Sequence, residues 1–155
     1  MDATQLISYL PALLKGVAVT LELMICALIL GLVLAIPMTL CSISNSRFLR
    51  TPVNAFTFFI RGTPLLVQIF LIYYGIGQFE IIRNSPFWIV LQEPFACAVI
   101  AFAINTCGYS VVLFKGAIAS VPSGEVAACE ALGMSRWLML KRVILPRAFR
   151  IVLPA

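Results

Sequence analysis

The apolar run at residues 17–40 constrains the fold of this chain more than any other feature of its sequence. Only Glu22 brings a charge into it, and only Pro37 interrupts its helical potential. A helix needs about 20 predominantly apolar residues to cross a bilayer. Of the 155 residues, 62% are apolar and 11% are charged, whereas soluble domains carry about 25% charged residues. The sequence therefore predicts an integral membrane protein.

Two further segments, at residues 53–74 and 95–114, are also long and apolar enough to span a bilayer. We therefore predict an all-α, polytopic membrane protein with about three transmembrane helices in a single domain. The segment at 115–146 that follows is amphipathic and is expected to form a loop outside the membrane. There is no His, and the five Cys are scattered without a Cys-x-x-Cys pair, so neither a metal site nor a disulfide framework is expected.

Basic residues set the expected orientation, because they accumulate on the cytoplasmic side of membrane proteins. The link between the first two spans carries Arg47 and Arg50. Six more follow the third span: Lys115, Arg136, Lys141, Arg142, Arg147 and Arg150. The sequence thus predicts an N-terminus outside the cell and the 115–146 loop in the cytoplasm.

The amphipathic loop is expected to contain two short helices. Ser123 can cap the start of the first, and Gly133 can end it in the left-handed conformation common at helix C-termini. Ser135 can cap the second helix, which is expected to end at Leu145, before Pro146. A helix, a glycine turn and a second helix form a shape suited to docking on a partner.

Arg61 places a permanent charge inside the second span, roughly 12 Å along a helix that begins at Val53. This costs about 2.5–3.5 kcal/mol, whereas the apolar residues of the span return about 4–7 kcal/mol, so the segment can insert. At helical spacing Arg61, Pro64 or Leu65, and Gln68 fall on one stripe. Pro64, with Gly62 beside it, is expected to interrupt the helix, as transporters do at substrate sites. Two interpretations stay open: a substrate pathway, or an Arg61 that reaches the cytoplasmic interface as an anchor.

Other polar residues in the spans leave the same choice open. Asn105 and Tyr109 share one side of the third span and can either line a pathway or hydrogen-bond between helices. Glu22 lies about two turns inside the outer face of the first span. It marks either the outer mouth of a pathway or an interfacial position.

Four motifs, in this order, resemble one known family: "RGTPLLVQIFLIYYG", "NTCGYS", "GAIASVPSG" and "GEVAACEALGMSRWLMLKRVILPRA". They are similar to motifs of the permease subunits of bacterial ABC importers for polar amino acids. The last is similar to the family's cytoplasmic loop, in which a Gly is followed after nine residues by Ile-x-Leu-Pro. Here nine residues separate Gly133 from Val143, and Leu145 and Pro146 complete the motif. The likeness is greatest to the branch for basic amino acids (arginine, or histidine with lysine and arginine).

The resemblance implies the N-terminal part of a five-span permease fold in the bacterial inner membrane. It implies a second permease subunit, two cytoplasmic ATPases that bind ATP, and a periplasmic amino-acid-binding protein. This chain would bind no cofactor and would not be an enzyme, since it has no phosphate-binding loop and no catalytic dyad. By this resemblance Arg61, Thr63, Pro64 and Gln68 shape the passage. The ATPase-coupling residues would be Gly124, Glu125, Ala127, Ala128, Cys129, Ala131, Leu132, Gly133, Leu145 and Pro146.

The sequence departs from the family pattern in three places. Ala127, Ala128 and Cys129 replace the family's Glu-Ala-Ala, and Val112 stands where many members carry Glu. Both changes suggest one half of an unequal pair of permeases. The chain also stops at "IVLPA", where the family continues with at least two more spans. A fragment or a truncated product is therefore expected, and the alternative function is a non-transporting remnant or scaffold that still binds the ATPase or the partner permease.

Overall fold

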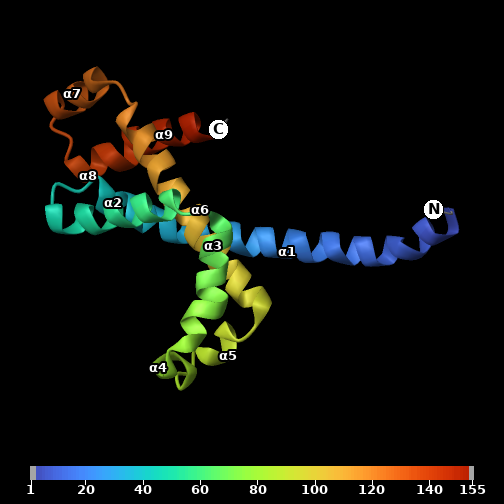
Figure 1. Cartoon of the computed structure of the whole chain (residues 1–155). Helices are drawn as coiled ribbons and strands as arrows, with labels where there is room; N and C mark the ends of the chain where they lie inside the picture. Colours follow the sequence, from blue (N-terminus) through green and yellow to red (C-terminus); the bar gives the residue numbers. More distant parts are fainter. Residues whose placement is uncertain (1–2, 154–155) are drawn as a thin grey trace. The chain divides into compact units, whose positions relative to one another are not determined.

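A computed structural model describes residues 3–153, in which every regular element is a helix (Figure 1). The long elements are α1 (Ala3–Ser42), α2 (Arg47–Gly62) and α6 (Pro94–Ala119). Between α2 and α6 lie α3 (Leu65–Phe70), the π-helix η1 (Leu71–Gly75), the 3-10 helix η2 (Ile76–Gln78), α4 (Glu80–Arg83) and α5 (Trp88–Leu91). After α6 come α7 (Ser123–Ala131), α8 (Arg136–Met139), the π-helix η3 (Leu140–Ile144) and α9 (Leu145–Val152). The predicted all-α fold is confirmed.

Two of these helices are long and apolar enough to cross a membrane, within the described part of the chain. One covers Tyr9–Ser42 and the other Pro94–Ala119, so the runs predicted at 17–40 and 95–114 each lie inside a longer helix. The segment predicted at 53–74 is instead a bent pair of helices, Arg47–Gly62 and Leu65–Gln78. Large apolar side chains on α1 are exposed, Ile29 by 58% and Val33 by 60%, as expected for a surface in contact with lipid.

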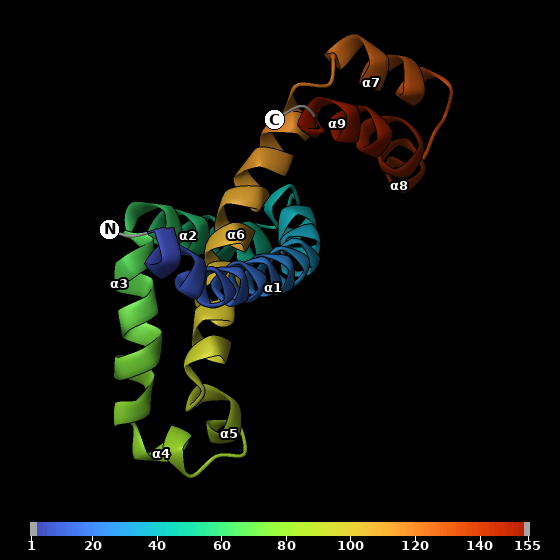
Figure 2. The same ribbon diagram turned by 90° about the vertical axis from the view of Figure 1, so that its right-hand side faces the viewer.

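The chain divides into two compact units, which we describe separately. The first contains α1 up to Leu34 and the stretch Ile60–Cys107. In it, α3 lies alongside the first part of α6, and α4 and α5 connect the two (Figure 2). Small residues of α6 fill its interior, among them Cys97, Ala101 and Ala103. Small residues let membrane helices approach closely, which compensates for the absence of a hydrophobic driving force in lipid.

Gly31 of α1 lies in close contact with α6 in the first unit. A Cβ atom at this position would lie 2.7 Å from the Cβ of Thr106 and 2.9 Å from the carbonyl oxygen of Ala103. Because the second of these atoms belongs to the backbone, it cannot rotate away. Only a residue without a side chain allows this packing.

We therefore expect Gly31→Ala and Gly16→Ala to change stability in opposite directions. Overpacking costs about 1–3 kcal/mol, which exceeds what alanine gains over glycine in a helix, so Gly31→Ala should lower the melting temperature of the purified protein in detergent. Gly16 lies in the same helix with nothing within 4 Å of an added Cβ. Gly16→Ala should raise the melting temperature slightly, and equal shifts in the two variants would contradict close packing at Gly31.

The second unit contains Ala35–Phe59 and the residues from Gly108 onward. Buried hydroxyl groups here bond to the backbone of their own helices, as when Thr39 donates to the carbonyl of Ala35 at 2.7 Å. Between helices, the Lys115 ammonium of α6 donates to the side-chain oxygen of Asn54 on α2 at 3.2 Å. These polar side chains thus have partners, as helices in lipid require.

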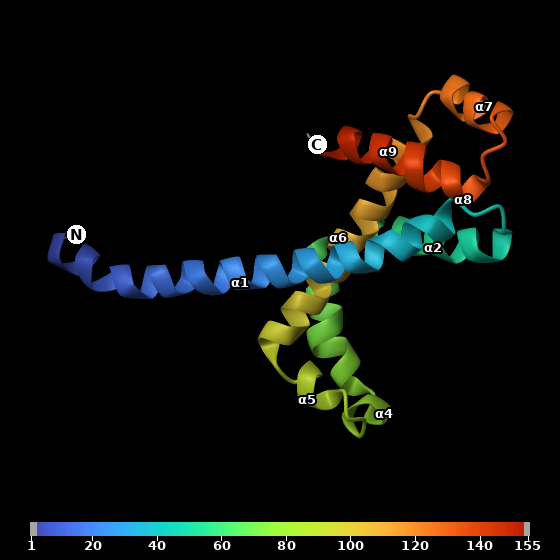
Figure 3. The same cartoon turned by 180° about the vertical axis from the view of Figure 1, so that it is seen from behind.

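Two expectations for the amphipathic loop were wrong. Ser123 is the first residue of α7 and not its cap; the cap position is Pro122, which has no side chain able to bond there. The second helix does not end at Leu145 either. It passes through the π-helix η3 into α9, in which Pro146 is the second residue (Figure 3). The predicted cap at Ser135 is confirmed, since its hydroxyl accepts from the N–H of Leu138.

Candidate functional site: the broken span and the glycine turn

The second apolar segment breaks at Thr63 and Pro64. Helix α2 ends at Gly62, Pro64 has an extended backbone with φ −60° and ψ 138°, and α3 begins at Leu65. The helical path bends by 107° at this break. Because a helix that loses backbone bonds at membrane depth exposes polar groups, something must satisfy them there.

The Gln68 side chain supplies the donor that Pro64 lacks. In an unbroken helix the carbonyl of Ile60 would accept from the N–H of residue 64, and proline has none. The Gln68 Nε2 donates to this carbonyl at 2.8 Å, and to the carbonyl and hydroxyl oxygens of Thr63 at 3.1 and 2.8 Å. One side chain therefore closes the broken end of α2.

Asn105 connects this arrangement to α6. Its Nδ2 donates to the Gln68 Oε1 at 3.3 Å, across 37 residues of sequence. Gln68 is only 5% exposed, and both ends of its carboxamide have partners. Among the described residues, no buried side-chain nitrogen or oxygen lacks a hydrogen-bond partner. The buried polar side chains at the break thus all have hydrogen-bond partners.

The structure brings together three of the residues predicted to shape a pathway: Thr63, Gln68 and Asn105. The expected stripe of Arg61 and Gln68 was wrong. The two residues belong to different helices, Arg61 being exposed and Gln68 buried, because helical periodicity stops at Gly62. Glu22 lies on an exposed part of α1, and Tyr109, in the second unit, is 51% exposed.

The turn between α7 and α8 has the bonding pattern of a Schellman motif, as predicted for a glycine at this position. Gly133 has φ +72°, the left-handed conformation. Its N–H donates to the carbonyl of Glu130 at 2.9 Å, and the N–H of Met134 donates to the carbonyl of Cys129 at 3.1 Å. These two bonds close the end of α7 and fix the direction in which the chain leaves it.

This turn presents its side chains outward. Leu132 is 81% exposed, and Gly124, Ala127, Ala128 and Ala131 of α7 are exposed too. Cys129 is buried, so α7 has one inward side and one outward side. Leu132 is thus a large apolar side chain that is open to contact by a partner.

An ion pair joins α7 to α9. The Arg147 guanidinium lies 2.5 Å from a carboxylate oxygen of Glu125, with the two side chains 56% and 31% exposed. A pair this exposed contributes about 0–1 kcal/mol. It is a side-chain link between α7 and α9, which are separated by α8 and η3 in the sequence. Leu145 and Pro146 lie exposed at the start of α9.

Sequence reasoning missed two of these roles. It placed Gln68 in a pathway, whereas its carboxamide replaces a backbone donor; the available signal was a glutamine four residues after a proline. It listed Glu125 among the ATPase-coupling residues and did not predict that Glu125 forms an ion pair with Arg147. No local signal in the sequence identifies that partner, because 22 positions separate the two residues.

Comparisons with known proteins agree with this architecture. The chain is 43% identical to the octopine transport system permease protein OccM of Rhizobium meliloti, over 92% of this chain and 58% of that protein. It is 40% identical to the histidine/lysine/arginine/ornithine transport system permease protein HisM of Escherichia coli, over 90% of this chain and 59% of that protein. The chain thus spans somewhat less than two thirds of the length of these relatives.

A solved structure and a family model match as well. The structure, of an amino acid ABC transporter with histidines, superimposes with a TM-score of 0.85 and 30% identity, covering 99% of this chain and 68% of the solved chain. The family model for the binding-protein-dependent transport system inner membrane component matches residues 27–155. The chain therefore belongs to the family of binding-protein-dependent transport system inner membrane components.

Proposed function

We propose that this chain forms part of the permease subunit of an ATP-driven importer for polar amino acids with basic side chains. The observation that carries the proposal is the α7–α8 element, with its left-handed Gly133 and the exposed Leu132. Such an element has the rigidity and the outward apolar side chain that a mechanical contact with an ATPase needs. The relatives named for octopine and for histidine, lysine, arginine and ornithine transport support the substrate class.

In this proposal the chain binds no cofactor itself. ATP is bound and hydrolysed by two cytoplasmic ATPases, one of which contacts the α7–α8 element. A second permease subunit completes the passage, and a periplasmic binding protein delivers the amino acid. The N-terminus lies outside the cytoplasm and the α7–α9 segment inside it, in agreement with the excess of basic residues after residue 114.

Thr63 and Pro64 give the broken span its role in this passage. A break leaves backbone groups and an adjacent charge within the apolar depth of the membrane, where transporters bind polar substrates. Arg61 is the second-to-last residue of α2, directly before the break, and its side chain is exposed. Because a guanidinium repels a cationic side chain, Arg61 acts either on the substrate carboxylate or on an acidic group of the partner permease.

Replacing Arg61 by Ala should impair uptake of arginine without impairing insertion of the protein into the membrane. Loss of a charge-assisted hydrogen bond costs about 1.5–3 kcal/mol, or about 10- to 150-fold in the apparent KM or the uptake rate. Radiolabelled uptake into proteoliposomes that contain the assembled transporter measures the effect. Arg61→Lys, which keeps the charge, serves as the matched variant and should retain more uptake than Arg61→Ala. Normal uptake by Arg61→Ala would exclude this role.

The same assay tests the proposed function as a whole. Transporter that contains this chain should take up a basic amino acid only when ATP and the binding protein are present. An intact complex that hydrolyses ATP but moves none of the basic amino acids would instead favour a scaffold that binds its partners without transport.

A further inference from the structure

The outward side of the segment α8–η3–α9, from Arg136 to Val152, combines exposed cations with large exposed apolar side chains. Four basic residues on it are exposed and have no acidic neighbour in the segment: Arg136, Lys141, Arg142 and Arg150. Trp137 and Phe149 are each 66% exposed. Met139 and Ala148 are buried, which fixes the opposite side as the one that packs on the protein. We call the exposed set the basic-aromatic face.

The apolar members of this face follow a four-residue spacing. Trp137, Leu145, Phe149 and Leu153 occur at this interval, with Lys141 at the remaining position. Residues four apart lie one above the other on a helix, although in a straight α-helix such a row drifts slowly around the axis. In the π-helix η3 the N–H of Leu145 bonds to the carbonyl of Leu140, five residues earlier. Each turn therefore contains more residues than in an α-helix, which counteracts this drift. The large apolar side chains therefore stay on one side of the segment, with the basic side chains beside them.

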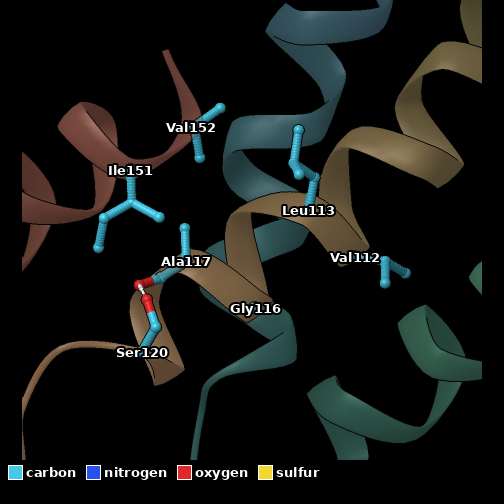
Figure 4. A pocket seen from close by; sticks show the side chains of 7 residues that line it. All are labelled: Val112, Leu113, Gly116, Ala117, Ser120, Ile151 and Val152. Carbon is cyan, nitrogen blue, oxygen red and sulfur yellow. Dashed lines mark hydrogen bonds between the residues drawn. The ribbon is translucent and has the colours of Figure 1, made fainter. Parts of the chain in front are cut away.

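The end of α9 is held next to the end of a membrane-spanning helix. Ile151 and Val152 of α9 face Leu113, Gly116 and Ser120 of α6 across a shallow apolar groove of about 360 Å³ (Figure 4). Helix α6 ends at Ala119, where its apolar span ends. This places α9 at the depth of the membrane surface.

We propose that the basic-aromatic face binds anionic phospholipid at the membrane surface. Lys and Arg near a membrane attract anionic headgroups, and Trp, Phe and Leu insert into the boundary between headgroups and acyl chains. An acidic protein surface would match the cations but would leave no use for the row of large apolar side chains. This inference needs only the position of the segment beside α6, and it does not depend on the substrate or the ATPase.

Tryptophan fluorescence gives a direct test, because the chain has only two tryptophans. In the Trp88→Phe variant, Trp137 is the sole reporter. The full chain is reconstituted into bilayers in which either phosphatidylglycerol or phosphatidylcholine carries bromine on its acyl chains, which quenches a tryptophan in contact with them. We expect both lipids to quench Trp137, with about a fivefold or greater preference for phosphatidylglycerol. One basic residue at an anionic membrane surface contributes a factor of about this size.

Two double variants, each of which removes two positive charges, test whether the basic residues of the face cause this preference. Lys141→Gln with Arg142→Gln should bring the preference for phosphatidylglycerol close to one, whereas Lys15→Gln with Arg83→Gln, far from the face in sequence, should leave it unchanged. Salt at about 0.5 M should weaken the preference in the parent chain, because it screens exposed charges. Absence of quenching by either lipid, or equal quenching by both, would overturn the proposal and leave a protein as the partner of this face.

Discussion

Replacing Gln68 by Leu should destabilise the protein strongly and abolish transport. Leucine has a similar size but no donor, so the carbonyls of Ile60 and Thr63 lose the bonds that now close the broken helix. The Ile60 carbonyl then keeps only the longer bond from the Thr63 hydroxyl, at 3.4 Å, and removing a donor from a buried acceptor costs about 1–3 kcal/mol. The melting temperature of the purified protein and the uptake of arginine by the assembled transporter measure the two effects.

Two further variants test whether the loss arises at the break. Gln78→Leu changes an exposed glutamine in η2, and a surface change of this kind should alter stability by no more than about 0.5 kcal/mol. Combining Gln68→Leu with Pro64→Ala restores an N–H at residue 64 that can bond to the Ile60 carbonyl. The double variant should therefore regain stability over Gln68→Leu, without the bend and without transport. If Gln68→Leu and Gln78→Leu were equally stable, Gln68 would not be the donor that closes the break.

Replacing Gly133 by Val should reduce uptake by about tenfold or more while the spans remain folded. At φ +72° a β-branched residue is strained by about 1–2 kcal/mol, and the chain can relieve this only by opening the Schellman turn. An added Cβ would meet nothing within 4 Å, so the effect comes from the backbone and not from a collision. Because the turn sets the direction of α8 relative to α7, the ATPase would lose its matching surface.

Gly133→Asn is the matched control, because asparagine tolerates the left-handed conformation. It should retain most of the uptake and most of the ATPase binding, as measured by co-purification with the ATPase. Stimulation of ATP hydrolysis by the binding protein and arginine should be lost with Val and retained with Asn. Normal assembly and transport with Val at position 133 would show that this turn does not couple the two subunits.

The relation between Gln68 and Pro64 also explains how a membrane helix can contain a permanent break. The bend changes the direction of the backbone between α2 and α3. The Gln68 carboxamide lowers the energetic cost of the break, because it bonds to the Ile60 carbonyl, for which proline supplies no donor. Asn105 then ties the break to α6. Movement of α6 relative to the break would strain this bond, so the two are expected to move together.

The class of the protein and its local turns could be predicted from the amino-acid sequence. Apolar length decides whether a helix enters a membrane, and it identified the runs at 17–40 and 95–114 within the two long helices. The left-handed turn at Gly133 and the cap at Ser135 were predictable, because each depends on the conformational preference of one residue and its nearest neighbours. The family was recognisable for the same reason, since its motifs are short and contiguous.

Contacts between residues far apart in the sequence could not be predicted in this way. The bond from Asn105 to Gln68, the approach of Gly31 to Ala103, and the ion pair between Glu125 and Arg147 each join residues far apart in sequence. Helical periodicity could not place Gln68, because the break that Gln68 itself closes ends the periodicity on which the expected stripe relied. A local pattern states what a residue can offer, whereas its partner depends on how distant segments pack.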